Sequence, residues 1–213
     1  MKKLCAAFAA IMTIATIMLL FGCGTDYMQN VSERRSGYYT ASDGMLTVTA
    51  VSGVRETPYT ADGAVGALKP YTLITVVPSA FDVDALYTYT ARIGDSVYGG
   101  ALTVHPFAAS FSAEFDAEVT DAQFTVEILS TGAKSTLTLK SLVTSAMMSF
   151  DRAIDAATTA VKPTGNYEIR ARIIKNPLDD NGVCWHVAFY ADSDRMSGVL
   201  LDPITAKVLA KKV

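Results

Sequence analysis

Apolar side chains at every second position are the pattern that most limits how this chain folds, and they dominate residues 45–140. The clearest stretch is residues 111–119, where Phe, Ala and Val alternate with serine and acidic residues. Because successive side chains of a strand point to opposite faces of a sheet, the pattern predicts a strand with one buried and one solvated face. The same alternation, or a run of β-branched residues, recurs at 46–51, 71–77, 87–93, 124–128 and 137–139.

Turn-forming residues separate these runs, among them Gly94-Asp95-Ser96 and Thr131-Gly132. About seven short strands over roughly a hundred residues are typical of an immunoglobulin-like or fibronectin-like β-sandwich. The sequence therefore predicts such a sandwich for residues 37–140. This segment contains neither a tryptophan nor a cysteine, so the prediction concerns the architecture and not a true immunoglobulin domain.

The apolar spacing changes after Lys140 to that of a helix. Residues 150–161 carry an amphipathic stripe, Ser149 is a candidate N-cap, and Pro163 with Gly165 ends the helix. We therefore expect a helix over these twelve positions. This helix and the strand-like runs that follow it predict a second domain at residues 141–213. The whole protein would then be a β-rich α+β protein. These runs cover residues 167–174, 183–191 and 198–209.

The N-terminal residues have the pattern of a targeting signal rather than that of a folded element. Lys2 and Lys3 precede an uncharged run, and a small residue, Gly22, comes directly before Cys23. A basic start, an apolar centre and a small residue before the cut are the layout of a secretory signal. An uncleaved N-terminal anchor and ordinary secretion are the alternatives, because about eighteen apolar residues are the lower limit for a membrane-spanning helix. Residues 23–36 lack an apolar period and read as a tether.

The residues Leu20-Phe21-Gly22-Cys23 resemble the lipobox of bacterial lipoproteins. The resemblance implies that residues 1–22 are a signal peptide that is removed, and that Cys23 is acylated. The protein would then be lipid-anchored in the cell membrane through Cys23, on its extracytoplasmic face. Firm anchoring needs more than one acyl chain, and the resemblance implies two or three.

Residues 185–189 and 198–209 resemble a PepSY-type domain. Their sequences are Trp-His-Val-Ala-Phe and Gly-Val-Leu-Leu-Asp-Pro-Ile-Thr-Ala-Lys-Val-Leu, and the family usually has glycine at the position of Ala206. The resemblance implies one helix with a small antiparallel sheet, and peptidase inhibition or protein–protein regulation in the cell envelope. Residues 52–59 with Asp62-Gly63 resemble a segment of uncharacterised surface lipoproteins from Gram-positive bacteria, which also join a β-rich part to a PepSY-like end.

Four residues are candidates for ligand or partner binding. Arg55, Glu56 and Asp62 fall in or beside a predicted loop between two strands, which a local Arg–Glu or Arg–Asp pair would hold. Trp185 is the only tryptophan of the chain.

No catalytic, metal or cofactor site is predicted. Cys184 and His186 are the only nucleophile–base pair, but they lie two residues apart on a strand, about 7 Å from one another, without an orienting acid. Cys184 is instead predicted to be a buried small hydrophobic residue. No Cys/His cluster suits zinc, and the acidic turns do not follow EF-hand spacing.

Charge limits the partners. Without residues 1–22 the chain has 16 basic and 21 acidic residues, a net charge of −5, which argues against a nucleic-acid partner. The sequence thus predicts a non-enzymatic binding or modulatory module at the membrane, with an envelope or secreted protein, such as a peptidase, as its partner. The alternatives are a ligand-binding receptor or hydrolase with its site in an interdomain cleft, and a structural spacer.

Overall fold

The computed structural model describes residues 27–60, 64–179, 182–191 and 196–212. The predicted signal peptide, the lipidation site Cys23 and the candidate binding residue Asp62 lie outside the described residues. In chain order the elements are η1 (Tyr27–Asn30), β1 (Val31–Ser42), β2 (Leu46–Glu56), β3 (Leu68–Pro78), β4 (Tyr87–Ile93), β5 (Ser96–Val104), β6 (Phe111–Phe115), β7 (Gln123–Ser130), β8 (Ala133–Ser141), α2 (Phe150–Val161), β9 (Glu168–Lys175), β10 (Val183–Tyr190), β11 (Met196–Leu201) and β12 (Val208–Lys212).

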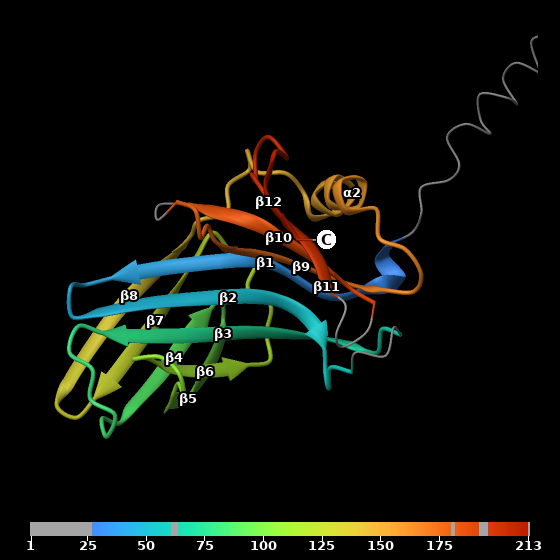
Figure 1. Ribbon diagram of the computed structural model, residues 1–213. Coiled ribbons are helices and arrows are strands. Elements are labelled where there is room, and N and C mark those ends of the chain that lie inside the picture. The colour runs from blue at the N-terminus through green and yellow to red at the C-terminus, as the bar shows by residue number, and fades with distance from the viewer. Residues whose placement is uncertain (1–26, 61–63, 180–181, 192–195, 213) are drawn as a thin grey trace, which may run out of the picture.

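Eight strands close into an antiparallel barrel (Figure 1). They lie in the order β1-β2-β3-β6-β5-β4-β7-β8, and β8 pairs again with β1, where Tyr39 lies opposite Ser141 and Thr40 opposite Lys140. The β-sandwich predicted for residues 37–140 is therefore wrong. Alternating side chains assign a face to each residue but do not determine which strands become neighbours, and a closed barrel shows the same alternation as two packed sheets.

The other four strands extend the same sheet beyond the barrel. β9 runs parallel to the first half of β1, from the pair Val31–Ile169 to the pair Arg35–Arg172, and β10, β11 and β12 follow in antiparallel order. The predicted PepSY-like α+β architecture is wrong as well. The sheet continues from the barrel to β12, and the described residues are nearly all β, with α2 as their single α-helix.

Residues 31–36, predicted to belong to the tether, form the first half of β1. Their side chains are mostly polar because this part of the strand lies beside a polar cavity rather than only against a hydrophobic core. A register shift between Arg35 and Gly37 interrupts the pairing of β1 with β2. At this shift Gly53 of β2 lies so close to the backbone of Arg34 that an added Cβ would collide with it, so the close approach of the two strands requires glycine.

A hydrophobic cluster fills the barrel. Val48, Ile74, Phe111, Val126 and Leu139 are fully buried in it and come from five different strands. Each is an inward residue of an alternating strand, as the sequence pattern predicts. At about 1.5–3 kcal/mol for each large side chain removed from water, this cluster is the main stabilising contribution to the barrel.

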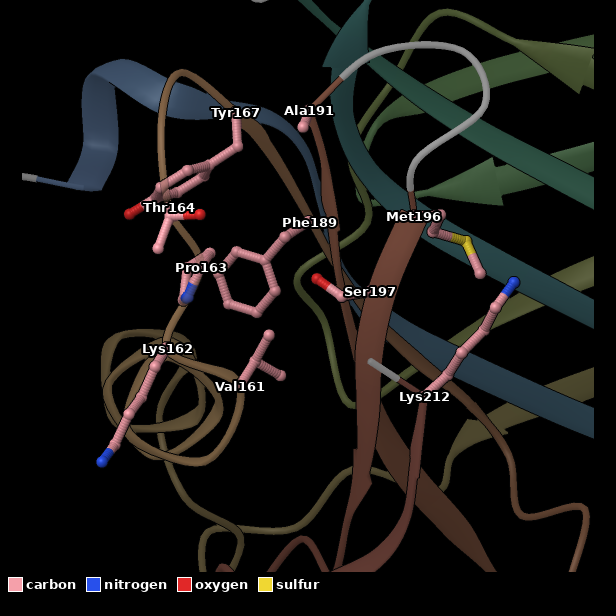
Figure 2. Close-up of a pocket in the computed structure, with 10 residues that line it drawn as sticks. All are labelled: Val161, Lys162, Pro163, Thr164, Tyr167, Phe189, Ala191, Met196, Ser197 and Lys212. Atoms are coloured by element: carbon pink, nitrogen blue, oxygen red, sulfur yellow. The ribbon is translucent and has the colours of Figure 1, made fainter.

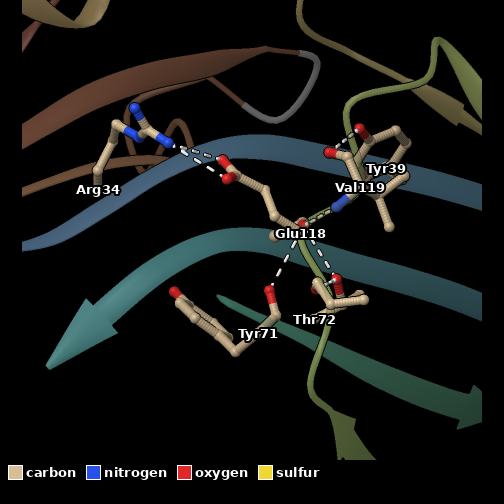
Figure 3. A network of polar contacts seen from close by, with 8 residues as sticks. Arg34, Tyr39, Tyr71, Thr72, Glu118 and Val119 are labelled. Atoms are coloured by element: carbon tan, nitrogen blue, oxygen red, sulfur yellow. Dashed lines mark hydrogen bonds and ion pairs between the residues drawn. The ribbon is translucent and has the colours of Figure 1, made fainter. Parts of the chain in front are cut away.

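The segment after β6 packs against the inner side of β1, β2 and β3 through buried hydrogen bonds (Figure 3). The Val119 amide donates to Ser52 Oγ at 2.7 Å, and Thr72 Oγ1 is 2.6 Å from the carbonyl oxygen of Ala117 and 2.9 Å from Ser52 Oγ. The Tyr39 hydroxyl donates to the Val119 carbonyl at 2.9 Å. Ser52 therefore joins the segment to two strands, which lets backbone groups be buried there without loss of hydrogen bonds.

α2 covers one face of β9, β10 and β11 (Figure 1). Its bounds, Phe150–Val161, and its N-cap confirm the helix prediction: Ser149 Oγ accepts a hydrogen bond from the Arg152 amide at 3.3 Å. Ile154 and Ala157 face Trp185 and Phe189 in a second hydrophobic cluster. On the opposite face, β9 carries the charged residues Arg170 and Arg172.

Ser52→Ala is expected to lower the free energy of unfolding by about 1–3 kcal/mol, because the Val119 amide would remain buried without its acceptor. Urea unfolding followed by circular dichroism measures the change. The matched control is Ser42→Ala at the exposed last position of β1, with an expected change within about 0.5 kcal/mol. Equal losses in the two variants would contradict the role given to Ser52.

Ala206→Gly is expected to raise the free energy of unfolding by about 0.5–1 kcal/mol. Ala206 has φ +62° in the turn before β12, a left-handed conformation that glycine adopts without the steric cost of a Cβ. Thermal unfolding measures the gain. Ala210→Gly within β12, where φ is not positive, should instead destabilise the protein, and a gain in both variants would contradict this explanation.

Candidate functional site

A polar cavity of about 430 Å³ lies where the barrel joins its extension, beside β1, β2, β3 and β9. We call it the arginine cavity. Its lining consists of Ser32, Glu33, Arg35, Arg55, Glu56, Thr57, Tyr59, Tyr71, Leu73, Arg170 and Arg172. Four of these eleven residues are arginines, from the consecutive strands β1 and β2 and from β9, more than a hundred residues later in the sequence.

The pairing of the strands explains why these charges meet. In the parallel pair of β1 and β9, Glu33 lies opposite Arg170 and Arg35 opposite Arg172. In the antiparallel pair of β1 and β2, Glu33 lies opposite Arg55. Alternate residues of a strand share a face, so these side chains gather on one side of the sheet. The apolar residues between them on β9 face α2.

A buried ion pair forms one wall of the cavity. Glu33 Oε2 lies 2.7 Å from Arg172 Nε and 2.5 Å from Nη2, and Glu33 Oε1 accepts a hydrogen bond from the Tyr71 hydroxyl at 2.7 Å. Burial by itself would raise the pKa of Glu33, but the charge of Arg172 and the Tyr71 hydrogen bond outweigh it and hold the pKa below its ordinary value. The same burial and the Glu33 carboxylate raise the pKa of Tyr71.

Arg55 forms an ion pair with a residue of a distant strand, β6, which lies on the other side of β3, and not with a residue of its own loop. Its Nη2 lies 2.5 Å from Glu114 Oε1, and its guanidinium stacks on the Tyr71 ring at 4.4 Å. The predicted local pair of Arg55 with Glu56 is therefore wrong, since the partner is 59 residues away. Strand pairing brings β6 beside β3, which the loop sequence could not reveal.

Arg170 and Arg35 have no ion pair in the described part of the chain. The Arg170 guanidinium lies between the rings of Tyr59, at 3.4 Å, and Tyr190, at 4.9 Å. Tyr59 also hydrogen-bonds to Glu168. The Nε atoms of Arg35 and Arg170 are buried and have no hydrogen-bond partner among the described residues. Burial lowers the pKa of Arg35, although a guanidinium remains charged at neutral pH.

Glu56 contributes an unpaired acceptor. It is only 7% exposed, and its Oε1 accepts a hydrogen bond from the Gly66 amide at 2.9 Å. Its Oε2 is buried and has no hydrogen-bond partner among the described residues. The residues that line the cavity thus include two with a buried donor and one with a buried acceptor that lack a hydrogen-bond partner among the described residues.

The other residues singled out in the sequence lie elsewhere. Trp185 is 2% exposed on the α2 side of the sheet, where its ring meets Phe150 edge to face, so the structure does not bring it to Arg55 and Glu56. Cys184 is fully buried, as predicted, and burial raises its pKa to about 11, which keeps the thiol protonated at neutral pH. Burial, together with Arg172 and Arg35, lowers the pKa of His186.

A second hollow, of about 460 Å³, lies between the end of α2 and strands β10–β12 (Figure 2). Its walls include Val161, Tyr167 and Phe189, and it also contains Lys162 and Lys212. In Figure 2 the two amino groups point to opposite sides rather than toward one another. The hollow therefore lacks the convergent polar groups that distinguish the arginine cavity.

Sequence reasoning found Arg55 and Glu56 but missed the three other arginines. Arg35 lies in the segment predicted to be a tether, and Arg170 and Arg172 lie in the strand-like run at residues 167–174, for which no site was predicted. A usable signal was present: β9 carries charges at alternate positions opposite an apolar face, and Glu33, Arg34 and Arg35 form a charged cluster.

Neither a family model nor a curated protein nor a solved structure matches this chain. Among the described residues, no helix combines the length and the apolar character that crossing a membrane requires. In the same part of the chain, no group of three or more His, Cys, Asp or Glu side chains is placed to hold a metal ion. The arginine cavity is thus the feature from which function can be argued.

Glu33→Gln is expected to lower the free energy of unfolding by about 3–5 kcal/mol at pH 7, because it leaves the Arg172 charge without its partner. The pKa of Glu33 is depressed in the folded protein, so its contribution is present above the ordinary pKa of 4.5 and lost as pH falls through the folded value. Urea unfolding should therefore show a smaller difference between variant and wild type at pH 3 than at pH 7.

The matched control is Glu127→Gln, which removes a more exposed ion pair with Lys134. Exposed pairs contribute about 0–1 kcal/mol, so this variant should differ little from wild type at either pH. A Glu33→Gln effect that stays constant between pH 7 and pH 3 would contradict the assignment of the pH dependence to this carboxylate.

Proposed function

We propose that this protein is a non-enzymatic binding protein whose arginine cavity takes up an anionic ligand, and that acylated Cys23 holds it on the extracytoplasmic face of the cell membrane. The observation that carries the proposal is that two arginines of the cavity lining, Arg35 and Arg170, have no ion-pair partner among the described residues. The predicted regulation of a peptidase stays a prediction that no feature of the cavity addresses.

The charge balance of the cavity supports an anion. Of the four lining arginines, Arg172 is neutralised by Glu33 and Arg55 by Glu114. Arg35 and Arg170 remain, and Glu56 is the one lining acid without an ion pair among the described residues. Charges held away from bulk water interact more strongly than charges in solvent, so the remaining guanidinium groups favour a negatively charged ligand.

The geometry of the arginines supports the same conclusion. A guanidinium presents planar, parallel donors that match a carboxylate or a phosphate group. Tyr59 and Tyr190 fix the plane of Arg170 by stacking, which lowers the conformational entropy lost when a ligand binds.

Binding is a better fit than hydrolysis. The described lining contains no histidine or cysteine, and Ser32 Oγ is directed to the carbonyl oxygen of Ile169, at 3.5 Å, rather than to a base. A hydrolytic nucleophile needs a neighbouring base to activate it. Of the alternatives left open by the sequence, the cavity therefore favours a ligand-binding receptor.

Arg35→Gln is expected to weaken anion binding about tenfold or more, because a hydrogen bond to a charged group contributes about 1.5–3 kcal/mol. The full-length protein, purified in neutral detergent, is titrated with acetate and with inorganic phosphate at constant ionic strength and followed by calorimetry. Arg92→Gln, on an exposed position of β4, removes the same charge away from the cavity and serves as control. Unchanged affinity in Arg35→Gln, or no binding of either anion to the wild type, would refute the proposal.

A further inference from the structure

We infer that the anion bound in the arginine cavity carries two negative charges on a single group, a phosphate dianion, and that Arg35 and Arg170 bind this group together. The inference rests on the proposed anion binding and specifies the class of ligand. Three features support it: the placement of the two arginines, the nitrogen atoms that they present, and the balance of charges around them.

Four charged side chains mark the corners of a rectangle on one face of the sheet: Glu33, Arg35, Arg170 and Arg172. Glu33 lies opposite Arg170, and Arg35 lies opposite Arg172. One diagonal of the rectangle is the ion pair of Glu33 with Arg172. The other diagonal joins Arg35 and Arg170, and adjacent strands about 4.8 Å apart with a step of about 3.3 Å per residue place their Cα atoms about 8 Å apart. Two long side chains at this separation can reach one small group between them.

The terminal nitrogen atoms of Arg35 and Arg170 are the donors that a ligand can reach. Both residues line the cavity, and neither side chain forms a hydrogen bond to another described residue; the Nε atom is the buried one in each. Their Nη groups therefore remain accessible. The rings of Tyr59 and Tyr190 cover the Arg170 guanidinium, so a ligand meets its edge, where parallel N–H groups match two oxygen atoms of a phosphate.

The charges of the lining leave an excess of two. Two of the four arginines are balanced by ion pairs, Arg172 with Glu33 and Arg55 with Glu114. The charges of Arg35 and Arg170 remain. A monoanion would neutralise one of them and leave the other, whereas a dianion placed between them neutralises both.

Neighbouring charges do not change this balance. Glu168 lies on the same face of the sheet, two residues before Arg170, and Lys69 lies on it opposite Arg55. They add one negative and one positive charge. Glu56 follows Arg55 along β2 and therefore points to the opposite face, so its carboxylate does not oppose a dianion in the cavity.

The size of the cavity leaves room for an organic group on the phosphate. Its volume of about 430 Å³ lies in the range found for sites of small organic molecules. Leu73 and Tyr59 add apolar surface to the lining, and Tyr59 is 39% exposed. A phosphate monoester with a small organic part therefore fits as well as free phosphate, and the experiment separates these two sources of the dianion.

The experiment titrates the full-length protein in neutral detergent by calorimetry at pH 8 and constant ionic strength. The probes are methyl phosphate, inorganic phosphate, dimethyl phosphate, acetate and succinate. At this pH a phosphate monoester is a dianion, because its second pKa is about 6, whereas the diester carries one charge. We expect the better of methyl phosphate and inorganic phosphate to bind about tenfold more tightly than dimethyl phosphate or acetate. Which of the two binds better tells an ester site from a site for free phosphate.

Arg35→Gln and Arg170→Gln test whether the two arginines bind the same group. Each variant removes one of the two positive charges, so the preference for the better dianion over dimethyl phosphate should fall from about tenfold to less than about threefold. The thermal unfolding temperature verifies that each variant is folded. A cavity that is merely distorted would bind both probes more weakly and keep the preference. Arg92→Gln, which removes a charge from β4, should leave every affinity unchanged.

Three results would overturn the inference while leaving anion binding intact. The first is that dimethyl phosphate or acetate binds as tightly as the better dianion. The second is that succinate, whose two charges lie on separate groups, binds as tightly as that dianion or more tightly. The third is that either arginine variant keeps the preference. If none of the probes binds, the proposed function itself fails, so the two failures are distinguishable.

Discussion

The structure depends on β1, because this strand belongs to the barrel and to its extension at once. One edge of β1 is bonded to β2 along nearly its whole length. Its other edge is divided: the first half is bonded to β9, and the second half closes the barrel with β8. Buried backbone groups need hydrogen-bond partners, and this division provides them without a break in the sheet. The register shift at Arg35 and Gly37 lies where the two halves meet.

The division of β1 also places the charged residues. Beyond the barrel, one face of the extension is covered by α2, and its side chains are apolar. Among the described residues no helix covers the other face, and there Glu33, Arg35, Arg170 and Arg172 come together. A partly enclosed polar cavity arises because the loop after β2 contributes Thr57 and Tyr59 to its lining. The strand that unites the fold is thereby also the floor of the candidate site.

Local features of the fold could be predicted from the sequence, and long-range ones could not. Helix α2 was found with its N-cap because amphipathic spacing, Ser149 and Pro163 are all encoded within a few residues. The barrel was missed because its closure depends on Tyr39 meeting Ser141, a pair that alternation alone does not specify. The tether prediction failed at residues 31–36 for a related reason, since a strand beside a polar cavity lacks the apolar period of a core strand.

The candidate site, too, could be predicted only where its residues are neighbours in the sequence. Arg55 and Glu56 were identified from a local cluster, but the partner of Arg55 is Glu114, and the cavity also needs Arg35, Arg170 and Arg172 from two other strands. From its neighbouring sequence alone, each of these arginines would be interpreted as an ordinary solvent-exposed charged side chain. Only the parallel pairing of β1 with β9, over more than a hundred residues of separation, makes them a group.

The position of β12 at the end of the strand order has a consequence for how copies of this protein meet. Among the described strands β11 is its one neighbour, so the outer edge of β12 could serve as a template for a strand of another molecule. β12 contains Lys211 and Lys212, and Lys207 directly precedes the strand. The Lys211 ammonium donates a hydrogen bond to the carbonyl oxygen of Ala160 at the end of α2. Ammonium groups beside an open strand repel a second, identical strand. The edge is therefore protected against self-association even at high protein concentration.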